Sequence, residues 1–232
     1  MTKNGTTIDT STANQGYIQI KHRPGTKRRK VRIKLNKSYT YDLNNKGDFE
    51  TYPLQMGNGT YKIIVFEQVR GTEYKQVSSF SVRAQMGDAK IAFTYPNQYV
   101  WYDEKSDVVA WSNTLCSGLN TDAAKLEAIQ SFVEGKFLYD HLKALTINNT
   151  SGYLPDVDNI LKMRKGVCFD FAALMASMLR VQGIPTQLVI GYAGNAYHAW
   201  NRVWIQGAWK LVDTTAQIAK MNVRKYTPEK YY

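Results

Sequence analysis

The sequence predicts an α+β protein, because an all-β segment is followed by a segment that combines helices with antiparallel strands. Residues 17–84 alternate apolar and polar side chains between turn residues and show no helical period. Residues 121–182 instead place apolar side chains three and four positions apart. Residues 187–212 then return to short β-rich runs, which favours helices packed on an antiparallel sheet in the second half.

A change of pattern after Arg83 marks the boundary between the two parts. The start of the chain is polar and lacks the apolar core of a signal peptide. We therefore expect a flexible N-terminus at 1–16, a small β-sandwich domain at 17–86 and a larger domain at 87–232. No run approaches the roughly 18 apolar residues of a membrane-spanning helix. The protein is thus either cytoplasmic or a chain whose leader has been removed.

Short strands are predicted throughout the first domain. In the run KVRIKL, Val31, Ile33 and Leu35 alternate with two basic residues, a period of two that is typical of a half-buried strand. Gly57-Asn58-Gly59 signals a turn, and a β-rich run follows from Tyr61 to Val69. The run GNGTYKIIVFE resembles a late hairpin of immunoglobulin-like domains, so we expect an immunoglobulin-like sandwich.

The second domain is predicted to begin with helices and to end with strands. Thr121 is a plausible N-cap, and Leu126, Ile129 and Val133 mark one buried face of the helix that follows. Gly183 is the expected left-handed cap at the end of a later helix. The remaining predictions are helices at 157–164 and 168–182, strands at 187–192, 199–205 and 209–212, and a hairpin turn at Gln206-Gly207.

Positive charge is concentrated in the first domain. The whole chain has a formal net charge of +11, and residues 1–86 carry 15 lysines and arginines against 6 acidic residues. The densest run is TKRRKVRIK, from Thr26 to Lys34. Such a run can attract polyanions, including nucleic acid, anionic cell-wall polymers and acidic lipid headgroups. The alternative is a solvated strand edge, where basic side chains discourage pairing between molecules.

Three residues form a constellation for nucleophilic catalysis. Cys168, His198 and Asp213 follow one another with gaps of 30 and 15 residues. A thiol needs a base to become a thiolate near neutral pH, and the base needs a third group that fixes its tautomer. Cys168 is expected at a helix N-terminus, where free amides stabilise a thiolate and an oxyanion. Counting back from the predicted hairpin turn places Asp213 beside residues 198–200, which supports a triad.

The other polar groups of these types receive structural interpretations. Two cysteines are too few for a disulfide scaffold or a zinc site built on paired cysteines, and Cys116 fits a small buried apolar residue. His22 and His141 lack any partner pattern. Asp170 is interpreted as a carboxylate that favours the helix dipole. Trp200, Trp204 and Trp209 are expected to pack the hairpin.

The segment from Thr121 to Thr215 resembles the transglutaminase-like superfamily, whose core is a papain-like cysteine fold. The resemblance covers a little under half of the chain and is specific in combination. Thr214 stands where the family usually has proline, a mild departure that should leave the carboxylate before it undisturbed. The matching pieces are Tyr139-Asp140, Gly166-Val167-Cys168, Asp170-Phe171-Ala172, Gly183-Ile184-Pro185, Gly191-Tyr192, His198-Ala199-Trp200 and Trp209 with Asp213-Thr214-Thr215.

This resemblance implies a catalytic domain at 87–232 that attacks an amide or peptide carbonyl. Cys168 would be the nucleophile, His198 the general base and acid, and Asp213 the residue that orients the imidazole. The Cys168 amide is the first expected oxyanion donor and Tyr139 a possible second. The acyl acceptor stays open between water, as in a protease or deamidase, and an amine, as in a transglutaminase, with a slight preference for hydrolysis. The competing hypothesis is a non-catalytic adaptor of the bacterial cell surface.

Expectations about partners and location rest on the same resemblance and on charge. The resemblance is to bacterial members of the family and implies a protein or peptide substrate, with one in the cell wall as a candidate, and no cofactor or metal. The basic first domain is expected to contact polyanions without reading a nucleic-acid sequence, because no recognised reader fold is evident. A secreted or cell-surface location is favoured, and a cytoplasmic one stays open.

Overall fold

The computed structural model describes residues 1–147 and 152–232, which divide into two compact units. The first unit is Met1–Gln98 and the second is Tyr99–Tyr232. The first unit is all-β apart from two short 3-10 turns, and the described part of the second combines helices with an antiparallel sheet. The α+β class expected from the sequence is therefore confirmed. Within the described residues, no helix is both long enough and apolar enough to cross a bilayer.

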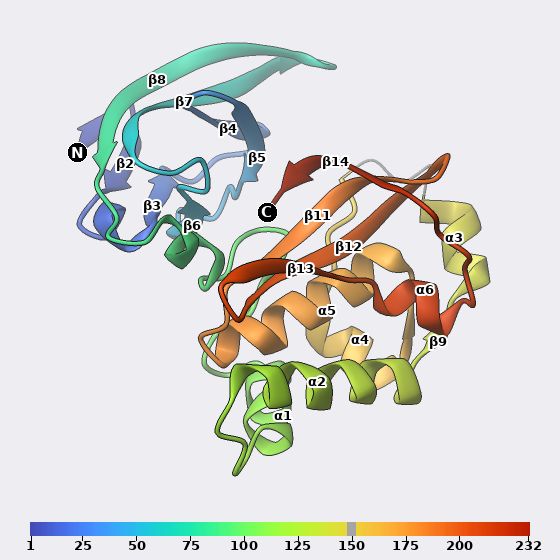
Figure 1. Ribbon diagram of the computed structural model, residues 1–232. Helices are drawn as coiled ribbons and strands as arrows, with labels where there is room; N and C mark the ends of the chain where they lie inside the picture. The colour runs from blue at the N-terminus through green and yellow to red at the C-terminus, as the bar shows by residue number, and fades with distance from the viewer. Residues whose placement is uncertain (148–151) are drawn as a thin grey trace. The chain divides into compact units, whose positions relative to one another are not determined.

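Two four-stranded antiparallel sheets build the first unit (Figure 1). Their strand orders are β1-β2-β3-β6 and β5-β4-β7-β8. Alternate side chains of both sheets are buried, and Tyr41 packs edge-on against Tyr52 across the core at 5.5 Å between ring centroids. The strands are β1 (Thr2–Lys3), β2 (Thr6–Asp9), β3 (Tyr17–His22), β4 (Arg29–Lys34), β5 (Ser38–Leu43), β6 (Glu50–Pro53), β7 (Gly59–Arg70) and β8 (Glu73–Ala84). The immunoglobulin-like relation stays a prediction.

The ends of the first unit differ from the sequence prediction. Residues 1–16 were expected to be flexible, but they supply β1 and β2, and Thr6 and Ile8 are buried. The Thr6 hydroxyl forms a hydrogen bond with His22 Nδ1 at 2.8 Å. The polar sequence of residues 1–16 contains no local pattern that predicts this tertiary contact. The unit also extends to Gln98 rather than residue 86, because the Gln98 side chain bonds the backbone of β5.

One buried helix organises the second unit. α5 (Cys168–Val181) lies between the sheet β13-β12-β11-β14 and the helices α1, α2 and α4 (Figure 1). Every residue from Asp170 to Arg180 is buried, so this helix forms the centre of the core. Around it lie α1 (Asp107–Leu115), α2 (Asp122–Lys136), β9 (Leu138–Tyr139), α3 (His141–Ile147), α4 (Val157–Met163), β10 (Lys165–Gly166), β11 (Thr186–Ala193), β12 (Ala196–Ile205), β13 (Ala208–Val212), α6 (Thr214–Ile218) and β14 (Tyr226–Tyr231).

Most elements predicted for the second unit are confirmed. The Thr121 hydroxyl accepts a hydrogen bond from the Ala124 amide and begins α2, as a capping residue should. Gly183 adopts φ +73° just after α5, the left-handed conformation expected there. Gln206 and Gly207 have φ values of +54° and +79°, which makes a two-residue turn between β12 and β13. The helices α1, α3 and α6 and the strands β9, β10 and β14 were not predicted.

The edge strand β14 closes over a glycine of β11. A Cβ atom at Gly191 would lie 2.2 Å from the backbone oxygen of Thr227, far inside contact distance. A side chain at this position must therefore push β14 away from β11. The glycine of the Gly-Tyr pair is thus required by close backbone approach.

We predict that Gly191→Ala lowers the free energy of unfolding by about 2–4 kcal/mol, because β14 must shift to relieve the clash. The matched control is Gly135→Ala in α2, where the new methyl group would meet nothing within 4 Å. That control should gain up to about 1 kcal/mol. Urea unfolding of both variants measures the difference, and equal stability of Gly191→Ala and the parent would contradict the close approach.

Candidate active site

Cys168 is the first residue of α5, immediately after the short parallel pairing of β10 with β9. Its thiol is free and half-buried, whereas the helix from Asp170 to Arg180 is buried in the core. The first amides of a helix have no partner within the helix, and they point towards whatever lies at its N-terminus. The fold therefore places a reachable sulfur beside backbone donors that can hold negative charge.

His198 and Asp213 meet at one end of the β12–β13 hairpin. In the strand register Asn201 lies opposite Val212, so Asp213 continues past the ladder towards Trp200 and His198. His198 Nε2 lies 2.8 Å from Asp213 Oδ2, and both side chains are only 4% exposed. The adjacency that hairpin counting predicted is present. Because Nε2 is engaged by the carboxylate, Nδ1 is the ring nitrogen left for the thiol.

Asp213 accepts two further hydrogen bonds. The Ala216 amide donates to Oδ1 at 3.0 Å, so this carboxylate also caps the start of α6. The Tyr226 hydroxyl donates to Oδ2 at 2.8 Å, and its ring packs on Trp200 with centroids 5.1 Å apart. Tyr226 was not identified from the sequence, because strand β14 was not predicted. No residue pattern near Tyr226 indicates that its side chain contacts the β12–β13 hairpin.

The pKa values of the pair are set by this burial and these bonds. Burial alone would lower the pKa of His198, but the hydrogen bond to Asp213, a hydrogen bond to Cys168 and the charges of both raise it to about 9. Burial would raise the pKa of Asp213, yet the hydrogen bonds from His198, Tyr226 and the Ala216 amide hold it below its usual value. Near neutral pH the site therefore contains an imidazolium and a carboxylate.

A cleft of about 520 Å³ opens over Cys168 and His198. Aromatic rings make up a large part of its walls, and its described lining includes one lysine and no aspartate or glutamate. Tyr139 lies on this wall, beside Gly166 in the β9–β10 pairing. Burial raises the pKa of Tyr139, and the neighbouring Cys168 and Asp170 raise it further, so its hydroxyl stays protonated next to the sulfur. The aromatic lining comprises Tyr99, Tyr139, Tyr153, Phe169, Tyr197 and Tyr232.

Asp170 does more than complement the helix dipole. Its carboxylate is fully buried and accepts the Val167 amide at 2.9 Å, which caps the first turn of α5. Lys143 Nζ lies 2.5 Å from Oδ2, and the Tyr153 hydroxyl donates to Oδ1. This cluster ties α3 and Tyr153 to the helix end that carries Cys168. A buried charge with these partners is compensated, as such burial requires.

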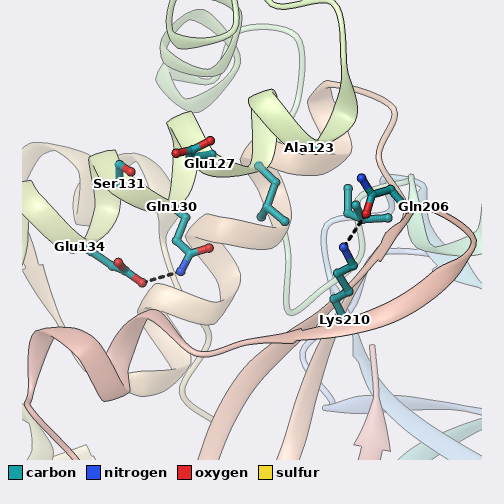
Figure 2. A pocket seen from close by; sticks show the side chains of 9 residues that line it. Ala123, Glu127, Gln130, Ser131, Glu134, Gln206 and Lys210 are labelled. Carbon is teal, nitrogen blue, oxygen red and sulfur yellow. Dashed lines mark hydrogen bonds between the residues drawn. The ribbon is translucent and has the colours of Figure 1, made fainter.

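A second hollow of about 290 Å³ lies between α2 and the β12–β13 turn. Figure 2 shows that Glu127 and Glu134 of α2 line one side and that Lys210 lies near the turn on the other. Gln130 bonds Glu134 and Lys210 bonds Gln206, each at 2.8 Å, so these polar groups pair with one another (Figure 2). No thiol or imidazole lines this hollow among the described residues, and we assign it no chemistry.

Cys116, His22, His141 and two of the three tryptophans have structural surroundings and do not line the cleft. Cys116 is buried beyond α1 and burial raises the pKa of its thiol, so it fits an inert core residue. His22 is buried in the first unit, and His141 is exposed at the start of α3 against the Tyr139 ring. Trp204 and Trp209 pair edge-to-face across the hairpin, as expected for packing. No cluster of metal-binding side chains occurs in the part of the chain that the structure describes.

Comparisons with known proteins agree with this architecture. Residues 109–214 match the family model of the transglutaminase-like superfamily. Kyphoscoliosis peptidase of Mus musculus is 30% identical over 135 residues, which cover 48% of this chain and 20% of that protein. A protein-glutamine gamma-glutamyltransferase of Pseudomonas aeruginosa is 31% identical over 83 residues, or 29% of this chain and 12% of that enzyme. The chain thus spans at most a fifth of either relative.

Two solved structures have a related arrangement at low similarity. A Cytophaga hutchinsonii protein solved as a candidate cysteine protease is 15% identical, with a TM-score of 0.47, and the match covers 98% of this chain and 83% of that one. Red sea bream transglutaminase is 13% identical, with a TM-score of 0.35, over 87% of this chain and 48% of that one. The family assignment rests on the match of residues 109–214 alone. Through residues 109–214, the chain belongs to the transglutaminase-like superfamily.

Proposed function

We propose that this protein is an enzyme that transfers or hydrolyses an acyl group at an amide carbonyl through Cys168, His198 and Asp213. One observation carries the proposal, the buried contact of 2.8 Å between His198 and Asp213 beside a reachable thiol. The tyrosine behind that carboxylate and the cleft over the thiol favour a reacting histidine over a structural one. The family match and the peptidase and glutamyltransferase names of two relatives support the same class of chemistry.

The proposed reaction has two halves. The Cys168 thiolate attacks the amide carbon, forming a carbon–sulfur bond and an oxyanion. The oxyanion collapses, the carbon–nitrogen bond breaks, and the His198 imidazolium gives its proton to the departing ammonia or amine. The neutral ring then takes a proton from the acceptor, water or an amine, as that acceptor attacks the thioester carbon. The carbon–sulfur bond breaks, the acyl product leaves, and the Cys168 thiolate and the His198 imidazolium are restored. Asp213 keeps the ring in one orientation and stabilises its charged form.

Two donors are proposed for the oxyanion. The first is the backbone amide of Cys168 at the N-terminus of α5, and the second is the hydroxyl of Tyr139. Tyr139 stays protonated and lines the cleft, and Cys168 is close enough to contribute to its raised pKa. These observations support this role. The lining of rings favours an extended protein or peptide substrate, since aromatic walls bury apolar side chains and leave hydroxyls for hydrogen bonds.

The acyl acceptor is proposed to be water, because the cleft is open and its described lining contains no acidic side chain that would bind an amine.

A secreted or cell-surface location is proposed from the resemblance to bacterial relatives. Fractionation of the source cells tests the location, and recovery only in the cytosol would contradict it. The adaptor alternative requires a thiol that does not react, which separates it from the enzyme.

We predict that Cys168→Ala abolishes activity, with a loss of at least about 1,000-fold, because no other described thiol faces the cleft. Ammonia release from glutamine peptides, peptide cleavage and conjugation of a tagged primary amine are measured in parallel. Cys116→Ala should retain activity within a few fold. In the parent protein, iodoacetamide near neutral pH should label Cys168 and spare Cys116. Persistent activity in Cys168→Ala would remove the sulfur from the mechanism, and an inert Cys168 would favour the adaptor.

We predict that Tyr139→Phe lowers kcat by about 10- to 100-fold with little change in KM, because it removes a donor used only in the transition state. Alkylation of Cys168 by iodoacetamide forms no oxyanion at a carbonyl and should proceed at the parent rate. Tyr197→Phe is the matched control, since this ring lines the same cleft but is 62% exposed. Equal kcat in Tyr139→Phe and the control would exclude the second donor.

We predict that Asp213→Asn lowers the pKa of His198 from about 9, because burial still acts against the charged ring while the hydrogen bond to the carboxylate and its charge are lost. NMR titration of the ring measures this. In the parent, the raised pKa adds stability that is complete below pH 6.5 and lost as pH rises through 9, and the variant should lose that dependence. Tyr226→Phe leaves the carboxylate charged and should keep the raised pKa. An unchanged titration in Asp213→Asn would contradict the assignment.

A further inference from the structure

The outer face of the sheet β5-β4-β7-β8 collects positive charge from several strands. Residues directly opposite one another in an antiparallel pair point to the same face. Lys34 of β4 lies opposite Lys62 of β7, and Arg32 lies opposite Ile64 one row along. On β8, Arg83 lies opposite Thr60, one row beyond Lys62. We call Arg32, Lys34, Lys62 and Arg83 the basic face, and all four are exposed.

The basic face is not the run of charges that dominates the sequence. Within that run, Arg29 is only 4% exposed and lies 3.1 Å from Glu67, which also pairs with Lys27 at 3.5 Å. Lys30 pairs with Asp42 at 3.3 Å. Two carboxylates thus pair with three cations of the run. Exposed cations without such a pair among the described residues include Arg28 within the run, Arg32 and Lys34 along β4, and Lys62 and Arg83 on neighbouring strands.

The four cations of the basic face have no acidic partner. Within residues 1–147 and 152–232, none of them makes a salt bridge. The row that holds Lys34 and Lys62 ends in Ser38 on one side and Ser81 on the other. Like charges placed directly opposite in a sheet are destabilising. The fold thus maintains an unfavourable pair that a bound anion would compensate.

The shape of the face selects the kind of anion. Cations two residues apart on one strand are separated by about 7 Å, and paired positions across strands by about 5 Å, so the face presents a grid of charge. The guanidinium of Arg32 lies over the Phe66 ring at 4.9 Å, and Ile64 is 9% exposed. No bare ring on these rows offers a base-stacking platform, and no apolar side chain stands out to enter a membrane. Serine and threonine hydroxyls surround the charges instead and can bond phosphate oxygens.

We propose that the basic face binds an extended phosphate polymer by charge and hydroxyl contacts, without reading its sequence. Such a contact would hold the protein on a polyanionic matrix. It is independent of the acyl chemistry in the second unit, so Cys168→Ala should bind like the parent. The occupant is identified by its repeating phosphates rather than by bases or acyl chains.

The test uses the full chain and long-chain inorganic polyphosphate, with affinity followed by titration calorimetry at several salt concentrations. The double variant Lys34→Gln/Lys62→Gln should bind at least about tenfold more weakly near 50 mM salt, and its log–log salt slope should fall by about 1.5. Its Tm should equal the parent value or exceed it by up to about 4 °C, because the like-charge pair is gone.

The control Lys27→Gln/Arg28→Gln removes the same charge from the dense run and should change affinity by less than about threefold. Equal losses in both double variants would reduce the effect to net charge and overturn the proposal, as would no loss in either. Single-stranded oligonucleotides and anionic vesicles form two further arms. Tighter binding of either one than of polyphosphate would also overturn the assignment.

Discussion

The second unit depends on one buried carboxylate, that of Asp213. It accepts hydrogen bonds from the His198 ring, the Tyr226 hydroxyl and the Ala216 amide, and therefore joins β12, β14 and the start of α6. A buried negative charge is costly unless it is fully compensated. These donors make the charge tolerable, and the same donors fix the ring that the proposed chemistry needs. The hydrogen bonds of Asp213 therefore stabilise the fold and position the site at the same time.

The helix α5 imposes the second constraint. Its interior turns are entirely buried, so its first residue can be reached only from the N-terminal end, where the cleft lies. Asp170 satisfies the Val167 amide and holds Lys143 and Tyr153 against that end. The sulfur is thus positioned by a rigid core on one side and by a polar cluster on the other. Such support is what a reacting group requires.

The sequence predicted those parts of the site that depend on local pattern. Hairpin counting brought His198 and Asp213 together, because register follows from one two-residue turn. Tyr226 and Lys143 could not be found in this way. Their contacts join segments that are distant in the sequence, and local residue spacing does not predict which distant segments meet. The same limit applies to charge. Thr26–Lys34 is the densest run in the sequence, yet pairing with Glu67 and Asp42 neutralises much of it, and Lys62 and Arg83 enter only through strand pairing.

The packing of Trp200 on His198 gives the protein an optical property. The two rings are nearly parallel, at 18°, with centroids 6.2 Å apart, and the indole is 2% exposed. Indole emission is quenched by a nearby imidazolium more strongly than by a neutral imidazole. We therefore expect the emission of Trp200 to change with the charge of the ring beside it.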